Sequence, residues 1–256
     1  MKISVITTCY NREKTIASAI ESTLSQDYAN KELVVIDGAS KDGSVKIINQ
    51  YKNELAYFVS EKDSGMYNAL NKGIQNCTGD IIGLLHSDDI FYNEKTLSKI
   101  AEAFEKTNAD IIYANGQYVD EKDIKNVKRI YKAKPFKKKY LKYGWIPLHT
   151  TIFAKKEVFE NYGLYREDFQ IASDYEISLR WFSNDLLKKE FLNDWIVKMR
   201  LGGKSTTMKQ QKKKTDEDIR IIKEYGLLGY FTAFSKIARK IPQYLIPKIF
   251  RINRSE

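Results

Sequence analysis

The chain has 256 residues, of which 43% are hydrophobic, and its formal net charge is +10. This length and composition suit a globular protein with one large domain or two small ones. The two cysteines, Cys9 and Cys77, belong to no CxxC pair or Cys/His cluster, which disfavours a disulfide framework and a zinc site. No stretch approaches the roughly 18 apolar residues needed to span a bilayer, and none has the form of a signal peptide. We therefore expect a cytoplasmic protein.

The first half of the chain alternates short apolar segments with segments of helical periodicity. Strands are expected at residues 3–10, 32–40, 55–61, 80–86 and 109–115. Helices are expected at residues 12–26, 44–53, 65–77 and 94–108. This alternation is typical of an α/β protein whose mostly parallel central sheet is covered by helices on both faces. After about Asp120 the pattern becomes less regular.

The segments that follow the expected strands are candidate ligand sites, because parallel sheets bind ligands beyond the carboxyl ends of their strands. These segments are residues 8–11, 37–42, 61–65 and 86–89. Three of the four carry acidic residues, which suit a metal ion or sugar hydroxyls better than a bare phosphate. No GxGxxG follows the first strand and no GxxxxGK[ST] occurs, so a dinucleotide fold and a P-loop are disfavoured.

The acidic pair Asp88 and Asp89 comes directly after the apolar run "IIGLL". Taken alone, such a pair is usually a solvated turn or a helix cap. Its position at the end of a buried strand instead favours a Mg2+ or Mn2+ site, because these ions prefer carboxylate oxygens. A divalent cation there would stabilise a diphosphate leaving group.

Seven segments, in their order and separations, resemble the inverting glycosyltransferases of family 2, which have the GT-A fold. They are "ISVITTCYNRE", "ELVVIDGASKDGS", "DSGMYNALNKGI", "GDIIGLLHSDD", "LHTTIFAKKEVFENYGLY", "FQIASDYEISLRW" and "LGGKS". The resemblance covers residues 1–206 and implies a nucleotide-sugar-binding half at 1–118 and an acceptor half at 119–206. It is strongest to bacterial members that build capsule, exopolysaccharide or lipid-linked O-antigen repeats.

The resemblance also implies roles for individual residues. Asp174 would be the catalytic base that accepts the proton of the acceptor hydroxyl, a type of residue that contributes about 10^2 to 10^4 in rate. Asp89 would be the protein ligand of Mn2+ or Mg2+, and Asp88 would hold the ribose. Further substrate contacts are expected from Thr8, Tyr10, Asp37, Asp63, Lys72 and His149. Without the resemblance, the same residues are explained by structural roles: packing at strand ends, turns, solvated helix positions and a helix cap.

Two positions depart from the family pattern. Many members have Asp-Asp where this chain has Asp37-Gly38, so the usual base contact is shifted or lost. His86 stands where an aspartate often opens the acidic motif, and we leave it out of the metal shell because a lone histidine beside a strand end is more often just hydrogen-bonded.

The positive charge gathers in residues 122–142 and in the last fifth of the chain. Residues 207–256 form a basic segment in which apolar residues recur at three- and four-residue steps, as in an amphipathic helix on anionic lipid. A helix docked on its own domain with a solvated basic face explains the same pattern. We expect phosphorylated substrates and anionic lipid as the partners of this charge, and no nucleic acid.

We therefore expect an enzyme that moves a sugar from a nucleoside-diphosphate sugar, a UDP-sugar, to a hydroxyl of a glycan or of a polyprenyl-diphosphate-linked acceptor. It would work at the inner face of the cytoplasmic membrane. The alternative is a non-catalytic protein of the same fold that binds sugar nucleotides or acts as a membrane-associated scaffold. The sequence does not fix the donor sugar, the linkage or the oligomeric state.

Overall fold

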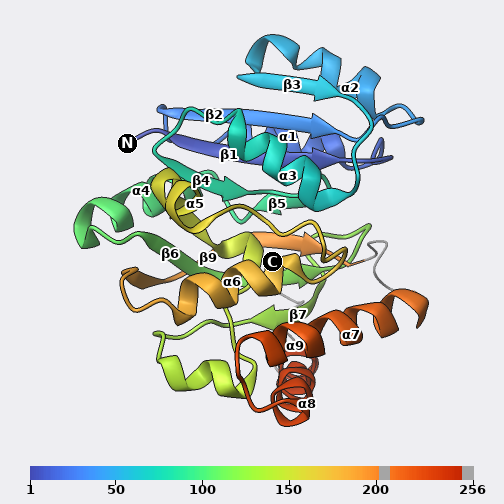
Figure 1. Cartoon of the computed structure of the whole chain (residues 1–256). Helices are drawn as coiled ribbons and strands as arrows, with labels where there is room; N and C mark the ends of the chain where they lie inside the picture. The colour runs from blue at the N-terminus through green and yellow to red at the C-terminus, as the bar shows by residue number, and fades with distance from the viewer. Residues whose placement is uncertain (202–207, 250–256) are drawn as a thin grey trace.

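The computed structural model describes residues 1–201 and 208–249, which contain a nine-stranded sheet flanked by helices (Figure 1). The order along the sheet is β3-β2-β1-β4-β8-β6-β9-β5, and β7 pairs with β6 outside this path. The α/β class expected from the sequence is confirmed. The strands β3, β2, β1 and β4 at one end of the sheet pair in parallel. The pairs at the other end are antiparallel, except that β6 and β9 pair in parallel.

The first half of the chain forms the parallel part. Its strands are β1 (Ile3–Cys9), β2 (Lys31–Asp37), β3 (Tyr57–Ser60) and β4 (Ile81–Leu84). They alternate with α1 (Ile16–Leu24), α2 (Ser44–Gln50), the short 3-10 helix η1 (Lys52–Glu54) and α3 (Met66–Gln75). Every residue of β1 is buried, because strands on either side and helices above and below cover it.

The second half adds α4 (Thr96–Thr107), β6 (Ile111–Val119), β7 (Val127–Tyr131), β8 (Phe153–Lys155), α5 (Lys156–Tyr162), α6 (Ser173–Ser183) and β9 (Lys189–Arg200). Two 3-10 helices, η2 (Lys138–Tyr143) and η3 (His149–Thr151), lie between β7 and β8. The halves join where β8 pairs antiparallel with β4. Gly83 makes this joint close, since a Cβ there would lie 2.0 Å from Cε1 of Phe153.

The expected strand at residues 80–86 ends at Leu84, and a separate three-residue strand, β5 (Asp89–Phe91), follows it. β5 pairs antiparallel with the end of β9, so that Asp89 lies opposite Met199. The acidic motif is therefore the tight connection between two strands of one sheet. Of the motif "LGGKS", Gly202 to Ser205 lie outside the described residues.

The C-terminal segment forms α7 (Met208–Glu224), α8 (Tyr230–Ala238) and α9 (Lys240–Ile249), coloured orange to red in Figure 1. These helices dock on the domain: Ile221 and Ile222 of α7 are fully buried, α8 contacts η2, and α9 lies along β7. Within residues 1–201 and 208–249, no helix combines the length and the apolar character needed to cross a bilayer.

Candidate functional site

Two cavities open near the segment that follows β4. The first, of about 300 Å³, is lined by Arg12, Asp88 and Arg200 among others, and we call it the Arg12 cavity. The second, of about 200 Å³, is lined by His149 and Asp174 together with residues of β7 and the C-terminal helices, and we call it the Asp174 cavity. Each cavity is formed by segments that are far apart in the sequence.

Asp88 presents its carboxylate to the Arg12 cavity. Its side chain is 25% exposed, and Nη2 of Arg12 lies 3.6 Å from Oδ2 of Asp88. Arg200, the last residue of β9, donates from Nη1 to the backbone carbonyl of Asp88 at 2.8 Å. The carboxylate of Asp88 and the guanidinium groups of Arg12 and Arg200 therefore meet at this cavity, whose lining also includes Glu13, Lys14, Asp42 and Glu121. Groups of both signs suit an anionic ligand and a cation bound with it.

Asp89 lies beneath this surface and does not line the cavity as the structure describes it. It is 2% exposed, and its Oδ1 accepts a hydrogen bond from the backbone N–H of Arg200 at 3.1 Å. Its Oδ2 is buried without a hydrogen-bond partner among the described residues. Burial, and next the negative charge of Asp88, raise the pKa of Asp89 well above its ordinary value. The carboxyl group that reaches the cavity is thus Asp88, whereas the sequence assigned the metal to Asp89.

Asp174 stands in the first turn of α6 and is contacted from two other elements. Oδ2 of Asp174 lies 3.4 Å from Nδ1 of His149 in η3, and its Oδ1 lies 3.2 Å from the hydroxyl of Tyr67 in α3. The Tyr67 hydroxyl is also 2.8 Å from the carbonyl of Ile171. The structure therefore brings together Asp174 and His149, two of the residues singled out in the sequence, and adds Tyr67.

His86 connects the two cavities. Its Nε2 lies 3.0 Å from Nε2 of His149, so one ring donates an N–H to the other. If Nδ1–H of His149 faces Asp174, then Nε2 of His149 is the acceptor and His86 carries its proton on Nε2. The charges of both Asp88 and Asp174 act on His86. This histidine, left without a role in the sequence, thus lies between the two carboxylates.

The pKa shifts favour an ionised Asp174 beside a neutral His149, with His86 neutral behind it. Burial lowers the pKa of His149 to about 4, against the opposing charge of Asp174. Burial also lowers the pKa of His86. Burial alone would raise the pKa of Asp174, but His149, Lys214 and Lys236 hold it below the ordinary value. At neutral pH the two lysines keep this effect when His149 is neutral, so Asp174 is available to accept a proton.

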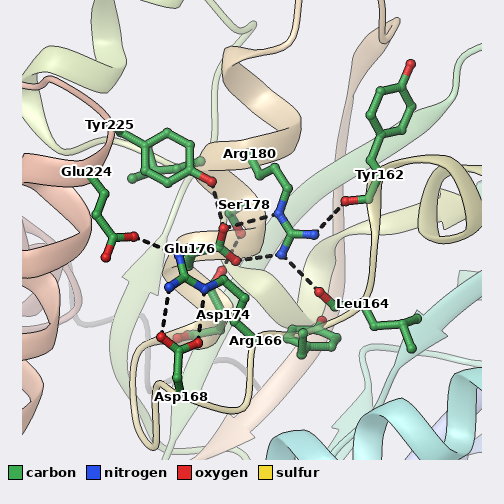
Figure 2. A network of polar contacts seen from close by, with 12 residues as sticks. Tyr162, Leu164, Arg166, Asp168, Asp174, Glu176, Ser178, Arg180, Glu224 and Tyr225 are labelled. Carbon is green, nitrogen blue, oxygen red and sulfur yellow. Dashed lines mark hydrogen bonds and ion pairs between the residues drawn. The ribbon is translucent and has the colours of Figure 1, made fainter.

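A polar network fixes α6, and with it Asp174 (Figure 2). Glu176, which is almost fully buried, accepts from Arg180 one turn later and from the hydroxyl of Tyr225, the residue that follows α7, at 2.7 Å. Arg180 also donates to the carbonyls of Tyr162 and Leu164 at 2.6 and 2.9 Å. The helix that carries Asp174 is thereby joined to the segment after α5 and to the C-terminal helices.

Glu217 of α7 supplies a second anchor directly before Asp174. Its carboxylate, in a residue that is 9% exposed, accepts the backbone N–H groups of Gln170, Ile171 and Ala172 at 3.0, 2.9 and 2.9 Å. No side chain of α6 or of Ala172, its N-cap residue, caps the helix. Glu217 therefore satisfies the donors that precede α6 and does so from another element.

Five other residues that the sequence singled out line neither cavity. Asp37 is fully buried and accepts from Ser40 and Ser60. Thr8 is buried at the end of β1, while Tyr10 is 44% exposed. These three residues lie at the carboxyl ends of β1 and β2, and their substrate contacts stay predictions.

Asp63 and Lys72 both form contacts within the protein near the carboxyl end of β3. Asp63 accepts the N–H of Gly65 at 3.0 Å, and burial raises its pKa. Its Oδ2 would lie 2.5 Å from a Cβ at Gly38, so a second aspartate in place of that glycine would collide with it. Lys72 pairs with Glu61 at 2.6 Å. A side chain at position 38 would therefore require the carboxylate of Asp63 to move.

Comparisons with known proteins identify the family of the chain. The model of the family described as "Glycosyl transferase family 2" matches residues 4–190. The chain belongs to glycosyl transferase family 2. A protein of Rickettsia typhi named an uncharacterized glycosyltransferase is 29% identical over 75% of this chain and 64% of its own length. A PGL/p-HBAD biosynthesis glycosyltransferase of Mycobacterium bovis is 25% identical over 80% of this chain and 79% of its own.

Solved structures share the fold of this family 2 chain. S. aureus TarS 1-349 in complex with UDP superposes with a TM-score of 0.68 at 21% identity, over 92% of this chain and 68% of that one. The mannosyltransferase PcManGT from Pyrobaculum calidifontis, in complex with GDP-Man and Mn2+, gives a TM-score of 0.65 at 17% identity, over 100% of this chain and 76% of that one. The GT-A architecture expected from the motifs is thereby confirmed. The chain spans about 64% of the Rickettsia relative.

The sequence missed several residues of the site. Arg12 lies inside the motif "TTCYNRE" but was given no role, although a basic residue after the first strand is a signal for an anionic ligand. Arg200 directly precedes Leu201, the first residue of the motif "LGGKS". Tyr67 and Glu217 reach the site only through tertiary contacts. Tyr67 lies inside the motif "DSGMYNALNKGI" but was given no role there, whereas no local pattern marks Glu217.

Proposed function

We propose that this protein transfers a sugar from a nucleoside-diphosphate sugar to an acceptor hydroxyl with inversion at the anomeric carbon. The observation that carries the proposal is Asp174, an ionised carboxylate held by His149 and Tyr67 at the wall of a cavity. A sugar hydroxyl is a poor nucleophile at neutral pH, and a positioned base of this kind contributes about 10^2 to 10^4 in rate.

In the proposed reaction, Oδ1 or Oδ2 of Asp174 takes the proton of the acceptor hydroxyl as that oxygen attacks the anomeric carbon. The bond from this carbon to the diphosphate breaks on the opposite face, and the nucleoside diphosphate leaves with the bonding electrons. His149 and Tyr67 hold Asp174 in place, and the neutral imidazole of His149 leaves the carboxylate as the proton acceptor.

The donor is proposed to lie along the carboxyl ends of β1 and β4 with its diphosphate at the Arg12 cavity. Arg12 and Arg200 supply positive charge there. TarS has been solved with UDP and with UDP-GlcNAc, which supports a UDP-sugar as the donor. The sugar itself is open, because the shape of the pocket sets it.

A divalent cation, Mn2+ or Mg2+, fits this cavity. Asp88 offers a carboxylate at the surface, and Asp89 adds a buried oxygen, Oδ2, which has no hydrogen-bond partner among the described residues. The described residues contain no group of three or more metal-binding side chains. Phosphate oxygens of the substrate would therefore complete the coordination shell of the ion. Of the two carboxylates we propose Asp88 as the direct ligand, since Asp89 faces inward. When bound, the cation offsets charge that builds on the leaving diphosphate.

The acceptor is proposed to be a glycan or a polyprenyl-diphosphate-linked glycan of a bacterial surface polysaccharide, reached at the inner face of the membrane. One face of α8 and α9 supports this location. Its exposed apolar residues are Tyr230 (73%), Phe234 (70%), Ile237 (57%), Ile241 (60%) and Ile249 (68%). Such a face beside basic residues suits insertion at an anionic lipid surface.

A donor screen tests the function. UDP-Glc, UDP-Gal, UDP-GlcNAc, UDP-GalNAc and dTDP-rhamnose would be incubated with glycan and lipid-linked acceptors, and release of nucleoside diphosphate would be measured with Mn2+ and with chelator. We expect acceptor-dependent release from one UDP-sugar that chelator suppresses. Tight nucleotide binding without release from any donor under these conditions would favour the non-catalytic alternative.

A further inference from the structure

The Asp174 cavity carries far more positive than negative charge. Five basic residues line it, and they come from four parts of the fold: Arg129 of β7, Lys214 of α7, Lys236 of α8, and Arg239 and Lys240 at the junction of α8 and α9. Asp174 is the one acidic residue among the lining residues that the structure describes. In Figure 1, α7, α8 and α9 lie together beside β7, which explains how these cations converge.

Most of these cations have no acidic partner. Lys236 pairs with Asp218 at 2.7 Å, whereas Arg129 donates to a neutral group, Oε1 of Gln243. In the part of the chain that the structure describes, Lys214, Arg239 and Lys240 form no ion pair. Burial lowers the pKa of Lys236 to about 8. Concentrating cations in a partly buried space is unfavourable unless an anion joins them, so the cavity is suited to an anionic ligand.

The position of the cavity indicates that its anionic ligand is part of the acceptor. Asp174 belongs to its wall, so a ligand held by the cations lies next to the proposed catalytic base. The remaining wall includes Trp145, Ile146 and Leu148, which suit the apolar face of a sugar ring. The donor diphosphate has a separate place at the Arg12 cavity, which shares no lining residue with this one.

We propose that the Asp174 cavity binds a phosphate group of the acceptor, a phosphate, diphosphate or phosphodiester close to the hydroxyl that is glycosylated. This inference rests on the proposed function and narrows its acceptor to a phosphorylated one. Lys214, Arg239 and Lys240 bind the phosphate oxygens by charge-assisted hydrogen bonds, and Arg129 is held in reach of them by Gln243.

The terminal helices α8 and α9 place an exposed apolar face next to the basic face that lines the cavity. Lys236, Arg239 and Lys240 face the cavity, whereas Phe234 and Ile237 are exposed on the outside. A phosphate linked to a lipid would enter the cavity while its chain continues along the apolar face. A phosphodiester in a polymer or a soluble acceptor would use the cavity alone. The phosphate chemistry is the same for both sources.

Binding of inorganic pyrophosphate and of farnesyl diphosphate to the full chain, with the donor site filled by saturating UDP, tests the proposal by calorimetry. We expect Lys214→Gln and Lys240→Gln each to weaken pyrophosphate binding about tenfold, the loss of one charge-assisted hydrogen bond. UDP affinity should not change, because neither lysine lines the Arg12 cavity, and thermal unfolding should show both variants folded. Lys223→Gln, the same change on an exposed part of α7, is the matched control.

Two results would overturn the proposal: an equal loss in Lys223→Gln, which would mean general charge attraction, or pyrophosphate binding that saturating UDP abolishes. Tighter binding of farnesyl diphosphate that Phe234→Ser reduces to the pyrophosphate level supports a lipid-linked source, and equal binding of the two supports a phosphate without lipid. These titrations need no turnover. A transferase that turns over a donor but fails them refutes this inference and leaves the proposed function standing.

Discussion

Removing the carboxylate of Glu217 should destabilise the segment at the N-terminus of α6. In Glu217→Ala, three backbone N–H groups, those of Gln170, Ile171 and Ala172, lose their acceptor. A typical intramolecular hydrogen bond contributes about 0.5 to 1.5 kcal/mol net, so three give about 1.5 to 4.5 kcal/mol. Because α7 stays docked through other buried residues, water can reach only part of the freed groups. We expect the free energy of unfolding to fall by about 3 kcal/mol.

Urea unfolding followed by circular dichroism measures this change, with Glu102→Ala as the control. Glu102 is an exposed helix residue, and its replacement should change the free energy of unfolding by no more than about 0.5 kcal/mol. Glu217→Ala should also lower kcat while leaving UDP affinity intact, since the loosened segment leads directly to Asp174. A loss below about 1 kcal/mol, or an unchanged kcat, would refute the view that α7 positions the base.

Three further predictions concern the acidic pair and the terminal helices. Asp88→Asn should abolish the Mn2+-dependent part of UDP binding while Asp89→Asn keeps it, and the reverse result in a calorimetric titration would restore Asp89 as the ligand. The folded state raises the pKa of Asp89 and so holds its proton more tightly than the unfolded chain, which makes wild-type stability fall as pH rises above the ordinary value of 3.8. In chelator, Asp89→Asn should therefore gain stability over the wild type from pH 5 to pH 7.5 in urea unfolding, and a pH-independent difference would contradict this. Phe234→Ser with Ile237→Ser should reduce sedimentation with phosphatidylglycerol vesicles several-fold, whereas Leu186→Ser, at a residue 84% exposed elsewhere, should not; equal effects would rule out the apolar face as the membrane contact.

The parallel half of the fold follows from local patterns. β1, β2 and β4 are mostly apolar segments that are buried on both faces, and such segments can be recognised without knowing their partners. β5 could not be recognised, because its three residues are a strand only through pairing with β9, more than a hundred residues later. The twelve residues of β9 are mostly half-buried and show no clean alternation.

The motifs singled out carboxylates that line the two cavities, but not the groups that surround them. The motifs located Asp88, Asp174 and His149, but the contact between the last two depends on how η3 and α6 pack. Asp37 was expected to contact the donor, yet its oxygens are engaged by Ser40 and Ser60, a detail that only tertiary structure gives.

The terminal helices show a similar limit. Periodicity separates a basic face from an apolar face, but does not say which one meets the domain. The sequence placed the basic face either on lipid or in solvent. In the structure Lys236, Arg239 and Lys240 instead turn toward Asp174, and the apolar side of the helices is left exposed.

The most direct test of the account is Asp174→Asn in the transfer assay. The variant keeps the size of the side chain and removes its ability to take a proton, so we expect it to fold, to bind UDP with wild-type affinity, and to lose about 10^2 to 10^4 in kcat. Wild-type turnover in a folded, UDP-binding Asp174→Asn protein would contradict the assignment of Asp174 as the catalytic base.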